Sequence, residues 1–222
     1  MREFGLDSPA ALTSLPMFPL ANCVLLPGGL LPLHVFEPRY RELTRDCLAD
    51  SKLLAIARLQ PGHEAEYFDR PPIYTHAGLG RIICSDELAD GRFHILLRGV
   101  GRVRVVEELS DDRSYRRVRA TLLDDRDSRR PDDVRERYNT LVSLCDRLAE
   151  VLEEGGDQLR ALIKSQNCAA DCADVLTAAL VTDPDDRQAL LEALDPADRL
   201  ERAITHVSKL VCELAPCTGE PN

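Results

Sequence analysis

No stretch of the sequence is apolar over the ~20 residues that a membrane-spanning helix requires. Residues 1–14 also lack the apolar core of a secretory signal, so we expect a cytoplasmic protein with no membrane partner. Basic residues are scarce, since 28 Lys and Arg stand against 38 Asp and Glu, a net charge of −10. This balance argues against a general nucleic-acid binder, which gains its affinity mainly from cations placed on phosphates.

Catalytic signatures are absent as well. The sequence contains no G-x-S-x-G, H-E-x-x-H or P-loop motif, and its five histidines include no pair at i, i+4. Lys164 and Ser165 are neighbours on a predicted helix, where adjacent side chains point about 100° apart, so they do not form a catalytic pair. We therefore predict a protein that is not an enzyme and has no catalytic residues or cofactor.

Cysteine knuckles of the C-x2-C type, which structural zinc sites commonly contain, are also missing. The eight cysteines are Cys23, Cys47, Cys84, Cys145, Cys168, Cys172, Cys212 and Cys217. Cys47 and Cys145 occupy apolar positions of predicted helices, where a free cysteine acts as a small buried hydrophobe. We predict free thiols, reduced as in the cytosol, and no metal site.

Arginine is locally abundant between residues 113 and 130, where it is interleaved with aspartate. The arginines are Arg113, Arg116, Arg117, Arg119, Arg126, Arg129 and Arg130. Because acids of opposite sign alternate with them, the run indicates a solvated strand edge and loop. RNA binding is the alternative interpretation of this run.

The most informative stretch, residues 15–40, is apolar, rich in proline and interrupted by Gly28-Gly29. Its prolines exclude a helix but suit the starts and edges of strands. We expect two strands, residues 15–20 and 30–36, joined as a hairpin through the Gly-Gly turn. A helix should follow, with Pro38 in its first turn.

Further strand patterns follow this stretch. They lie at residues 52–59, 75–88, 92–99, 101–109 and 114–125. Asp90-Gly91 predicts a hairpin turn between two of them. Gly78 and Gly80 inside a strand indicate a bulge or a close backbone approach. These strands with one helix predict an α+β fold in which a mostly antiparallel sheet curls around its core.

From residue 131 onward the periodicity becomes helical. An apolar stripe recurs every three or four residues along 134–152. Asp183-Pro184 and Asp195-Pro196 are each typical of a helix N-cap followed by the first helical residue. The expected organisation is a flexible leader (1–14), a β domain (15–125), a helical domain packed on it (131–215) and a disordered tail (216–222).

Four segments resemble the N-terminal, PUA-like substrate-binding domain of Lon proteases, which also occurs alone in bacteria and within cereblon. They are LPMFPL (Leu15–Leu20), VLLPGGLLPLHVFEPRY (Val24–Tyr40), THAGLGRI (Thr75–Ile82) and DGRFHILLRGVGRVRVVE (Asp90–Glu107). The resemblance implies a PUA-like β pseudo-barrel followed by a C-terminal α-helical bundle. It confers no proteolysis, because the ATPase and Ser-Lys protease modules of full-length Lon are not among these segments.

The resemblance implies binding of unfolded or tagged polypeptide in protein quality control. Polypeptide clients or a AAA+ protease are the implied partners, with a homodimer as one assembly. We predict the peptide contacts at the strand-to-helix corner, formed by Phe36, Glu37, Arg39, Tyr40 and Arg41. In a purely structural interpretation, Phe36 and Tyr40 belong to the core while Glu37 pairs with Arg39.

Two alternative functions stay open at this point. One is a small-molecule or nucleotide-binding module in the groove between sheet and helices. The other is weak RNA binding through the PUA-like fold.

Overall fold

A computed structural model describes residues 11–63, 70–110, 112–124, 127–128 and 130–214 of the 222-residue chain. The chain forms two compact units. The sheet unit comprises residues 1–124 and 182–192, and the helical unit comprises residues 125–181 and 193–222. Most of the expected leader and the whole expected tail lie outside the described residues, and the packing of one domain on the other stays a prediction.

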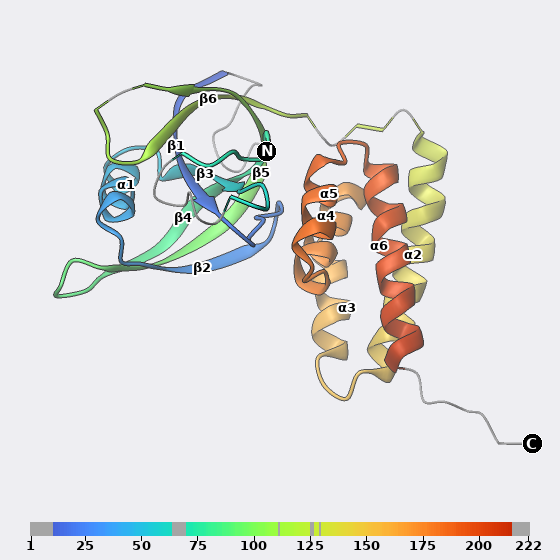
Figure 1. The fold of residues 1–222 in the computed structure, drawn as a ribbon. Helices are drawn as coiled ribbons and strands as arrows, with labels where there is room; N and C mark the ends of the chain where they lie inside the picture. The colour runs from blue at the N-terminus through green and yellow to red at the C-terminus, as the bar shows by residue number, and fades with distance from the viewer. Residues whose placement is uncertain (1–10, 64–69, 111, 125–126, 129, 215–222) are drawn as a thin grey trace, which may run out of the picture. The chain divides into compact units, whose positions relative to one another are not determined.

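The sheet unit is built on six described strands (Figure 1). They are β1 (Ala11–Leu20), β2 (Leu30–Val35), β3 (Leu53–Arg58), β4 (His76–Glu87), β5 (Phe93–Leu109) and β6 (Arg116–Leu122). Their order is β2-β5-β4-β3-β1-β6, and β5 also pairs with β6, which closes the five strands other than β2 into a ring. Only the β1–β3 pairing of these strands is parallel. The predicted α+β fold with a mostly antiparallel, barrel-like sheet is confirmed.

β5 is shared between two neighbours along its length. Residues 93–98 pair with β2, whereas residues 103–109 pair with β6. The prediction of two separate strands, 92–99 and 101–109, is therefore wrong. Glycine at 99 and 101 suggested a break, but the backbone continues through both positions as one strand.

The predicted hairpin between the first two strands is also wrong, because β1 pairs with β3 and β6 while β2 pairs with β5. The connecting residues 24–26 are buried and pass over glycines of the sheet. A Cβ added to Gly78 would lie 2.0 Å from the Leu25 carbonyl oxygen, and one on Gly99 would lie 2.1 Å from that of Leu26. Of the two features predicted at Gly78, a bulge or a close backbone approach, the structure shows the close approach. Residues 24–26 therefore cross the sheet instead of returning along β1.

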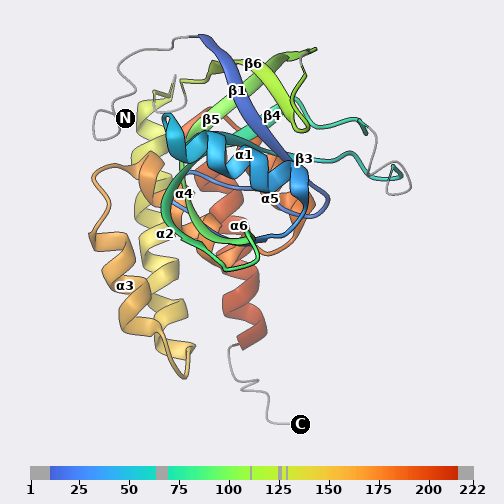
Figure 2. The ribbon, with the colours of Figure 1, turned by 90° about the vertical axis from the view of Figure 1, so that its left-hand side faces the viewer.

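The helix α1 (Pro38–Ala49) covers one face of these strands and begins at Pro38, as predicted (Figure 2). β3 is buried on both faces. Leu54 and Ile56 join the core cluster that includes the buried face of α1, while Ala55 and Ala57 join a second cluster with the neighbouring strands. The side chains that β3 places at positions 55 and 57 of the second cluster are therefore small, and larger Leu, Val and Met side chains from the neighbouring strands pack around them.

The short helix α5 (Pro184–Glu192) groups with the sheet unit, although the sequence analysis assigned it to the helical domain. Asp183 is its N-cap, as predicted, and its Oδ1 accepts the N–H groups of Asp185 at 2.9 Å and Asp186 at 3.0 Å. The buried Arg58 of β3 reaches the same helix end, with Nη1 2.7 Å from Asp185 Oδ1. A charged contact thus fastens residues from late in the sequence to the sheet.

The helical unit contains four described helices. They are α2 (Pro131–Val151), α3 (Gly156–Lys164), α4 (Ala169–Leu180) and α6 (Pro196–Leu214). The predicted apolar stripe of α2 forms part of the core, with Leu141, Cys145 and Leu148 buried against α4 and α6 residues. Asp195 is the predicted cap of α6, since its Oδ1 accepts the Ala197 N–H at 2.9 Å. None of the described helices is long and apolar enough to cross a membrane.

Candidate functional site

The predicted peptide-binding corner is largely occupied by contacts that fix the start of α1. The Tyr40 ring is buried and stacks on Phe18, with centroids 4.0 Å apart and planes 19° apart. Glu37 and Arg39 form an ion pair with a 3.0 Å Oε2···Nη2 distance. The Arg39 guanidinium also lies 4.6 Å from the centroid of the Tyr40 ring. For Glu37, Arg39 and Tyr40 the structural interpretation therefore accounts for the positions observed.

Arg41 contacts the tip of the β4–β5 hairpin. A Cβ on Gly91 would lie 2.1 Å from Arg41 Nη2, and Gly91 has a φ of 77°, as the predicted Asp90-Gly91 turn requires. One turn further along α1, Arg45 donates to Glu87 Oε1 at 3.1 Å. These arginines join the helix to the hairpin, so Arg41 also has a scaffold role.

Phe36 is the residue of the corner that faces outward, with 60% of its surface exposed. Leu30, at the other end of β2, is exposed to the same extent. Because side chains alternate along a strand, Leu30, Pro32 and His34 lie on one side of β2, and Phe36, the residue directly after the strand, continues this alternation. All four are exposed. We call these four residues the β2 outer face.

Two histidines lie together beside Phe36. His34 on β2 is opposite His94 on β5 in the strand register, and their rings meet edge to face with centroids 4.9 Å apart. The His34 ring also lies 5.9 Å from the Phe36 ring. Both histidines are exposed. The pair extends the β2 outer face onto β5.

β2 is an edge strand among the described strands, since β5 is its one partner there. The Gly99 N–H donates to the Gly29 carbonyl at 2.9 Å. The direction of the backbone N–H and C=O groups alternates along an antiparallel strand. The backbone groups of the odd-numbered residues of β2 therefore point toward β5, and those of the even-numbered residues point toward the open edge. Pro32 is on the open side, the position at which a proline interrupts no hydrogen bond of the sheet.

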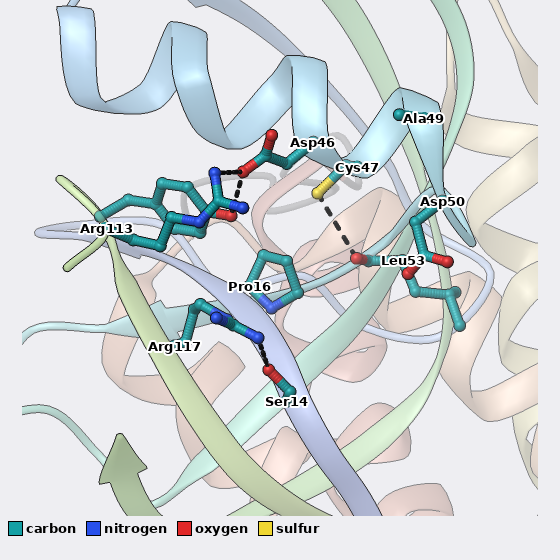
Figure 3. A pocket seen from close by; sticks show the side chains of 10 residues that line it. Ser14, Pro16, Asp46, Cys47, Ala49, Asp50, Leu53, Arg113 and Arg117 are labelled. Atoms are coloured by element: carbon teal, nitrogen blue, oxygen red, sulfur yellow. Dashed lines mark hydrogen bonds and ion pairs between the residues drawn. The ribbon is translucent and has the colours of Figure 1, made fainter. Parts of the chain in front are cut away.

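A cavity of about 250 Å³ lies between the end of α1 and the strands β1 and β6 (Figure 3). Its apolar lining comprises Pro16, Cys47, Ala49, Leu53 and Tyr115. Its polar lining comprises Ser14, Asp46, Asp50, Arg113 and Arg117. Figure 3 shows Arg113 and Arg117 on one side of Pro16 and Asp50 on the other. The lining therefore combines charged groups of both signs with apolar side chains, and Asp46 lies on the same side as the two arginines.

Several polar groups of this cavity are already oriented. Asp46 Oδ2 accepts the Tyr115 hydroxyl at 2.6 Å and lies 2.7 Å from Arg113 Nη1. Burial, together with the hydrogen bond to Asp46, raises the pKa of Tyr115, so the phenol stays protonated. Burial also raises the pKa of Cys47 to about 12, with Asp46 and Asp50 adding to the effect. The thiol is neutral at physiological pH, and the cavity offers groups for binding, not an activated sulfur nucleophile.

The sequence indicates only part of the β2 outer face and of the cavity beside α1. The alternation within LLPLHVF, residues 30–36, contained the signal for the β2 outer face, because it separates even from odd positions. The cavity had no comparable signal, since its lining comes from three separate segments, 14–16, 46–53 and 113–117. Only the folded chain brings these segments together.

Within the run at 113–130, carboxylates pair with Arg113, Arg116, Arg119 and Arg130, and Arg117 donates to the Ser14 hydroxyl. Arg116 is buried, pairs with Glu108 and donates to the Pro71 carbonyl at 2.9 Å. Arg119 pairs with Glu107 at 2.7 Å. Outside the described residues lie Arg126 and Arg129. The pairing of Arg116 and Arg119 agrees with the interpretation of this run as a strand edge rather than a phosphate-binding patch.

The described cysteines are free thiols. They are Cys23, Cys47, Cys84, Cys145, Cys168, Cys172 and Cys212. Within the described part of the chain, no group of three or more His, Cys, Asp and Glu side chains is arranged to hold a metal ion. Cys217 lies outside that part.

Comparison with solved structures relates this fold to known domains. A Lon N-terminal domain protein from Xanthomonas campestris matches with a TM-score of 0.63 and 28% identity, over 87% of this chain and 98% of that one. The N-terminal domain of Mycobacterium avium complex Lon protease matches with a TM-score of 0.65 at 21% identity, over 88% and 98% of the two chains. The second likeness concerns the fold alone.

Comparison of sequences gives the same relationship. Lon protease 2 of Myxococcus xanthus is 28% identical over 200 residues, which are 90% of this chain and 23% of that protein. Lon protease of Anaeromyxobacter dehalogenans is 26% identical over 208 residues, 94% of this chain and 23% of that protein. This chain therefore spans less than a quarter of the length of these relatives. The model of the ATP-dependent protease La (LON) substrate-binding domain matches residues 14–209, and the chain accordingly belongs to this family.

Proposed function

We propose that this chain is a non-catalytic module that binds extended, unfolded or tagged polypeptide segments, with the β2 outer face as its contact surface. The observation that supports this most directly is the exposure of Leu30 and Phe36, each 60% accessible, on one side of an edge strand. Large apolar side chains gathered on a surface commonly mark interaction sites. Membership in a family of substrate-binding domains supports the same proposal.

The geometry suits two kinds of contact at once. Side chains of the bound segment would pack on Leu30, Phe36 and the His34–His94 pair, which together form a shallow apolar and aromatic surface. The open edge of β2 would add backbone hydrogen bonds, as in β-strand addition. Since Pro32 provides no N–H, this pairing is interrupted, and the apolar contacts would carry most of the affinity.

The other corner residues would act indirectly in this proposal. Tyr40, Glu37 and Arg39 hold the first turn of α1, and Arg41 holds the hairpin tip, so together they position Phe36. Their replacement would alter binding by disturbing the fold. A direct test must therefore change exposed side chains and leave the buried Tyr40 intact.

The polypeptide partner would be a client chain, and a AAA+ protease is a second partner that the Lon relatives suggest. In this proposal the module would present clients to a protease and would perform no proteolysis itself. The oligomeric state belongs to the same proposal, because a homodimer would present two outer faces and raise the effective affinity for a long client.

The test uses a reduced and carboxymethylated, permanently unfolded protein as the probe. The double variant Leu30→Ser/Phe36→Ser should bind it about tenfold or more weakly, since an aromatic contact at an interface is commonly worth more than 1 kcal/mol. Val106→Ser is the matched control, because Val106 is 54% exposed on β5 outside the β2 outer face. If the folded double variant bound the probe as tightly as the natural chain does, the β2 outer face would not be the contact surface.

A second candidate function, binding of a small molecule, is favoured by the cavity beside α1. Its volume of about 250 Å³ falls below the roughly 300–1,000 Å³ of pockets that hold drug-sized ligands. A nucleotide is therefore too large for the cavity, and a smaller ligand is the one to consider.

A further inference from the structure

The His34–His94 pair belongs to the β2 outer face through His34, which stands between Pro32 and Phe36 along the chain. The backbone groups of His34 point toward the open edge, so His34 and His94 are a non-hydrogen-bonded pair of antiparallel strands. Facing side chains are closest at such positions. Because the His34 ring also lies 5.9 Å from the Phe36 ring, a polypeptide that covers Phe36 meets these imidazoles as well.

The observed ring contact suits two neutral imidazoles. The rings meet edge to face with centroids 4.9 Å apart, which places the positive edge of one ring against the negative face of the other. Protonation gives an imidazole a positive charge, and like charges directly opposite each other on paired strands are unfavourable. Histidine is the side chain that commonly changes its charge between about pH 5 and pH 8. The character of this part of the outer face therefore depends on pH.

Asp86 is the carboxylate beside the pair. It lies on β4 directly opposite His94 in the strand register, and it is exposed. His34 is one strand further away, so Asp86, His94 and His34 form a row across three strands. One carboxylate balances one imidazolium. A second proton on the pair would leave an excess positive charge beside Phe36.

The other charged groups around the pair are held in ion pairs or lie at the far end of the face. The ion pairs are Arg92 with Asp90 at the hairpin tip, Glu87 with Arg45 of α1, and Glu37 with Arg39. At the far end, Arg98 on β5 and Arg81 on β4 continue the row of Leu30. With both imidazoles protonated, the outer face would have positive charge near both of its ends, which favours a carboxylate on the bound segment.

We propose that the His34–His94 pair determines which polypeptide segments the β2 outer face accepts. Uncharged apolar segments bind when both imidazoles are neutral, and segments with a carboxylate among their apolar residues bind when the imidazoles are protonated. This inference rests on the peptide-binding proposal and adds a pH-dependent specificity to the same site.

The physical reason is the cost of removing water from a charge. A neutral imidazole pair extends the aromatic surface of Phe36, and an apolar side chain can cover it at little cost. An apolar side chain that covers an imidazolium removes water from a charge and provides no partner for it, which opposes binding. A carboxylate of the bound segment instead replaces that water with a charge-assisted hydrogen bond.

The specificity is tested with two rhodamine-labelled peptides that have large side chains at alternate positions. The leucine peptide contains Ser-Phe-Ser-Leu-Ser-Leu-Ser, and the aspartate peptide contains Ser-Phe-Ser-Asp-Ser-Leu-Ser. Fluorescence anisotropy measures the affinity of each at about pH 7.5 and about pH 5.8, on either side of the usual charge change of histidine. The ratio of the affinity for the leucine peptide to that for the aspartate peptide should fall about tenfold or more at the lower pH.

The assignment to the histidine pair is tested with a double variant and a matched control. His34→Gln/His94→Gln should lose the change in the affinity ratio, because glutamine is polar but has no charge to gain. His76→Gln should retain it, since His76 is half-buried on β4 outside the β2 outer face. The comparison also removes any effect of pH on the charge of the whole protein, which both variants share.

The outcomes separate this inference from the peptide-binding proposal. If Leu30→Ser/Phe36→Ser weakens binding of the leucine peptide but the affinity ratio of the natural chain is the same at both pH values, the outer face binds polypeptide and the inference is wrong. If that variant binds as tightly as the natural chain, both proposals are wrong. An equal change of the ratio in the natural chain and in a folded His34→Gln/His94→Gln protein also overturns the inference, because another group would then cause it.

Discussion

Arg102 on β5 donates a hydrogen bond from Nε to the carbonyl oxygen of Leu191, 3.0 Å away, at the end of α5. Arg102 is 1% exposed, and its Nη2 also lies 3.4 Å from the Leu190 carbonyl oxygen. A buried guanidinium thus satisfies carbonyls that a helix leaves unpaired at its C-terminus. With Arg58 at the other end of the same helix, both ends of α5 are tied to the sheet.

The first prediction is that Arg102→Met destabilises the sheet unit by about 2–4 kcal/mol, because it leaves buried carbonyls without donors. Urea unfolding followed by circular dichroism measures this change. Arg104→Met is the matched control, since Arg104 is exposed two residues away on the same strand and should change stability by less than about 0.5 kcal/mol. Similar stability losses in the two variants would contradict the structural role assigned to Arg102.

The second prediction concerns the crossing of residues 24–26 over the sheet. Gly99→Ala should destabilise the protein by more than about 2 kcal/mol, because the new Cβ would lie 2.1 Å from the Leu26 carbonyl oxygen and the backbone must shift. Gly101→Ala, on the same strand, meets its nearest atom at 3.4 Å and should be tolerated. The difference in urea midpoint between these two alanine variants is the measurement. A Gly99→Ala protein as stable as Gly101→Ala would exclude the crossing as described.

Local sequence signals predicted most elements of this fold. Pro38 marked the start of α1, Asp183 and Asp195 marked two helix caps, and aliphatic runs marked the buried strands. These features act over a few residues, so the sequence alone reveals them. The order in which the strands pair was predicted less well. The Gly28-Gly29 pair suggested a hairpin, whereas Gly78 and Gly99, distant in the sequence, leave room for residues 24–26 to cross the sheet.

The candidate site shows the same division between local and distant information. Exposure of Phe36 and burial of Tyr40 both depend on which face of the corner the rest of the chain covers. A sequence motif that contains both residues does not separate them. The grouping of Arg117 with Asp50 in one cavity depends on tertiary packing over more than sixty residues, which no local pattern encodes.

The third prediction is that cysteine alkylation follows burial. Burial raises the pKa of Cys47 and of Cys145 to about 12, so on the order of one thiol in ten thousand is ionised at pH 8. Cys84 and Cys212 are exposed and should react first with iodoacetamide, as measured by mass spectrometry of the native protein. In urea all four should react at comparable rates. Labelling of native Cys47 as fast as Cys84 would contradict the burial described.

The fourth prediction is a loss of helical-unit stability at acid pH through Asp195. Burial by itself would raise the pKa of this carboxyl. Hydrogen bonds from the Ser128 hydroxyl and the Ala197 N–H, with the Arg130 guanidinium beside it, outweigh burial and lower the pKa. The unfolded chain therefore binds a proton more readily than the folded one, and stability increases with pH in this range.

The stabilisation from Asp195 should be complete above the unfolded pKa of about 3.9 and should be lost as the pH falls through the lower folded value. Thermal unfolding monitored by circular dichroism between neutral and acid pH measures this dependence. Asp195→Asn should lower the midpoint at neutral pH and flatten its decline in acid, because the ionisable group is gone. Asp157→Asn is the control, since the Asp157 side chain is 98% exposed and should leave the acid profile unchanged. If Asp195→Asn retained the full acid dependence of the natural chain, other carboxylates would have to account for it.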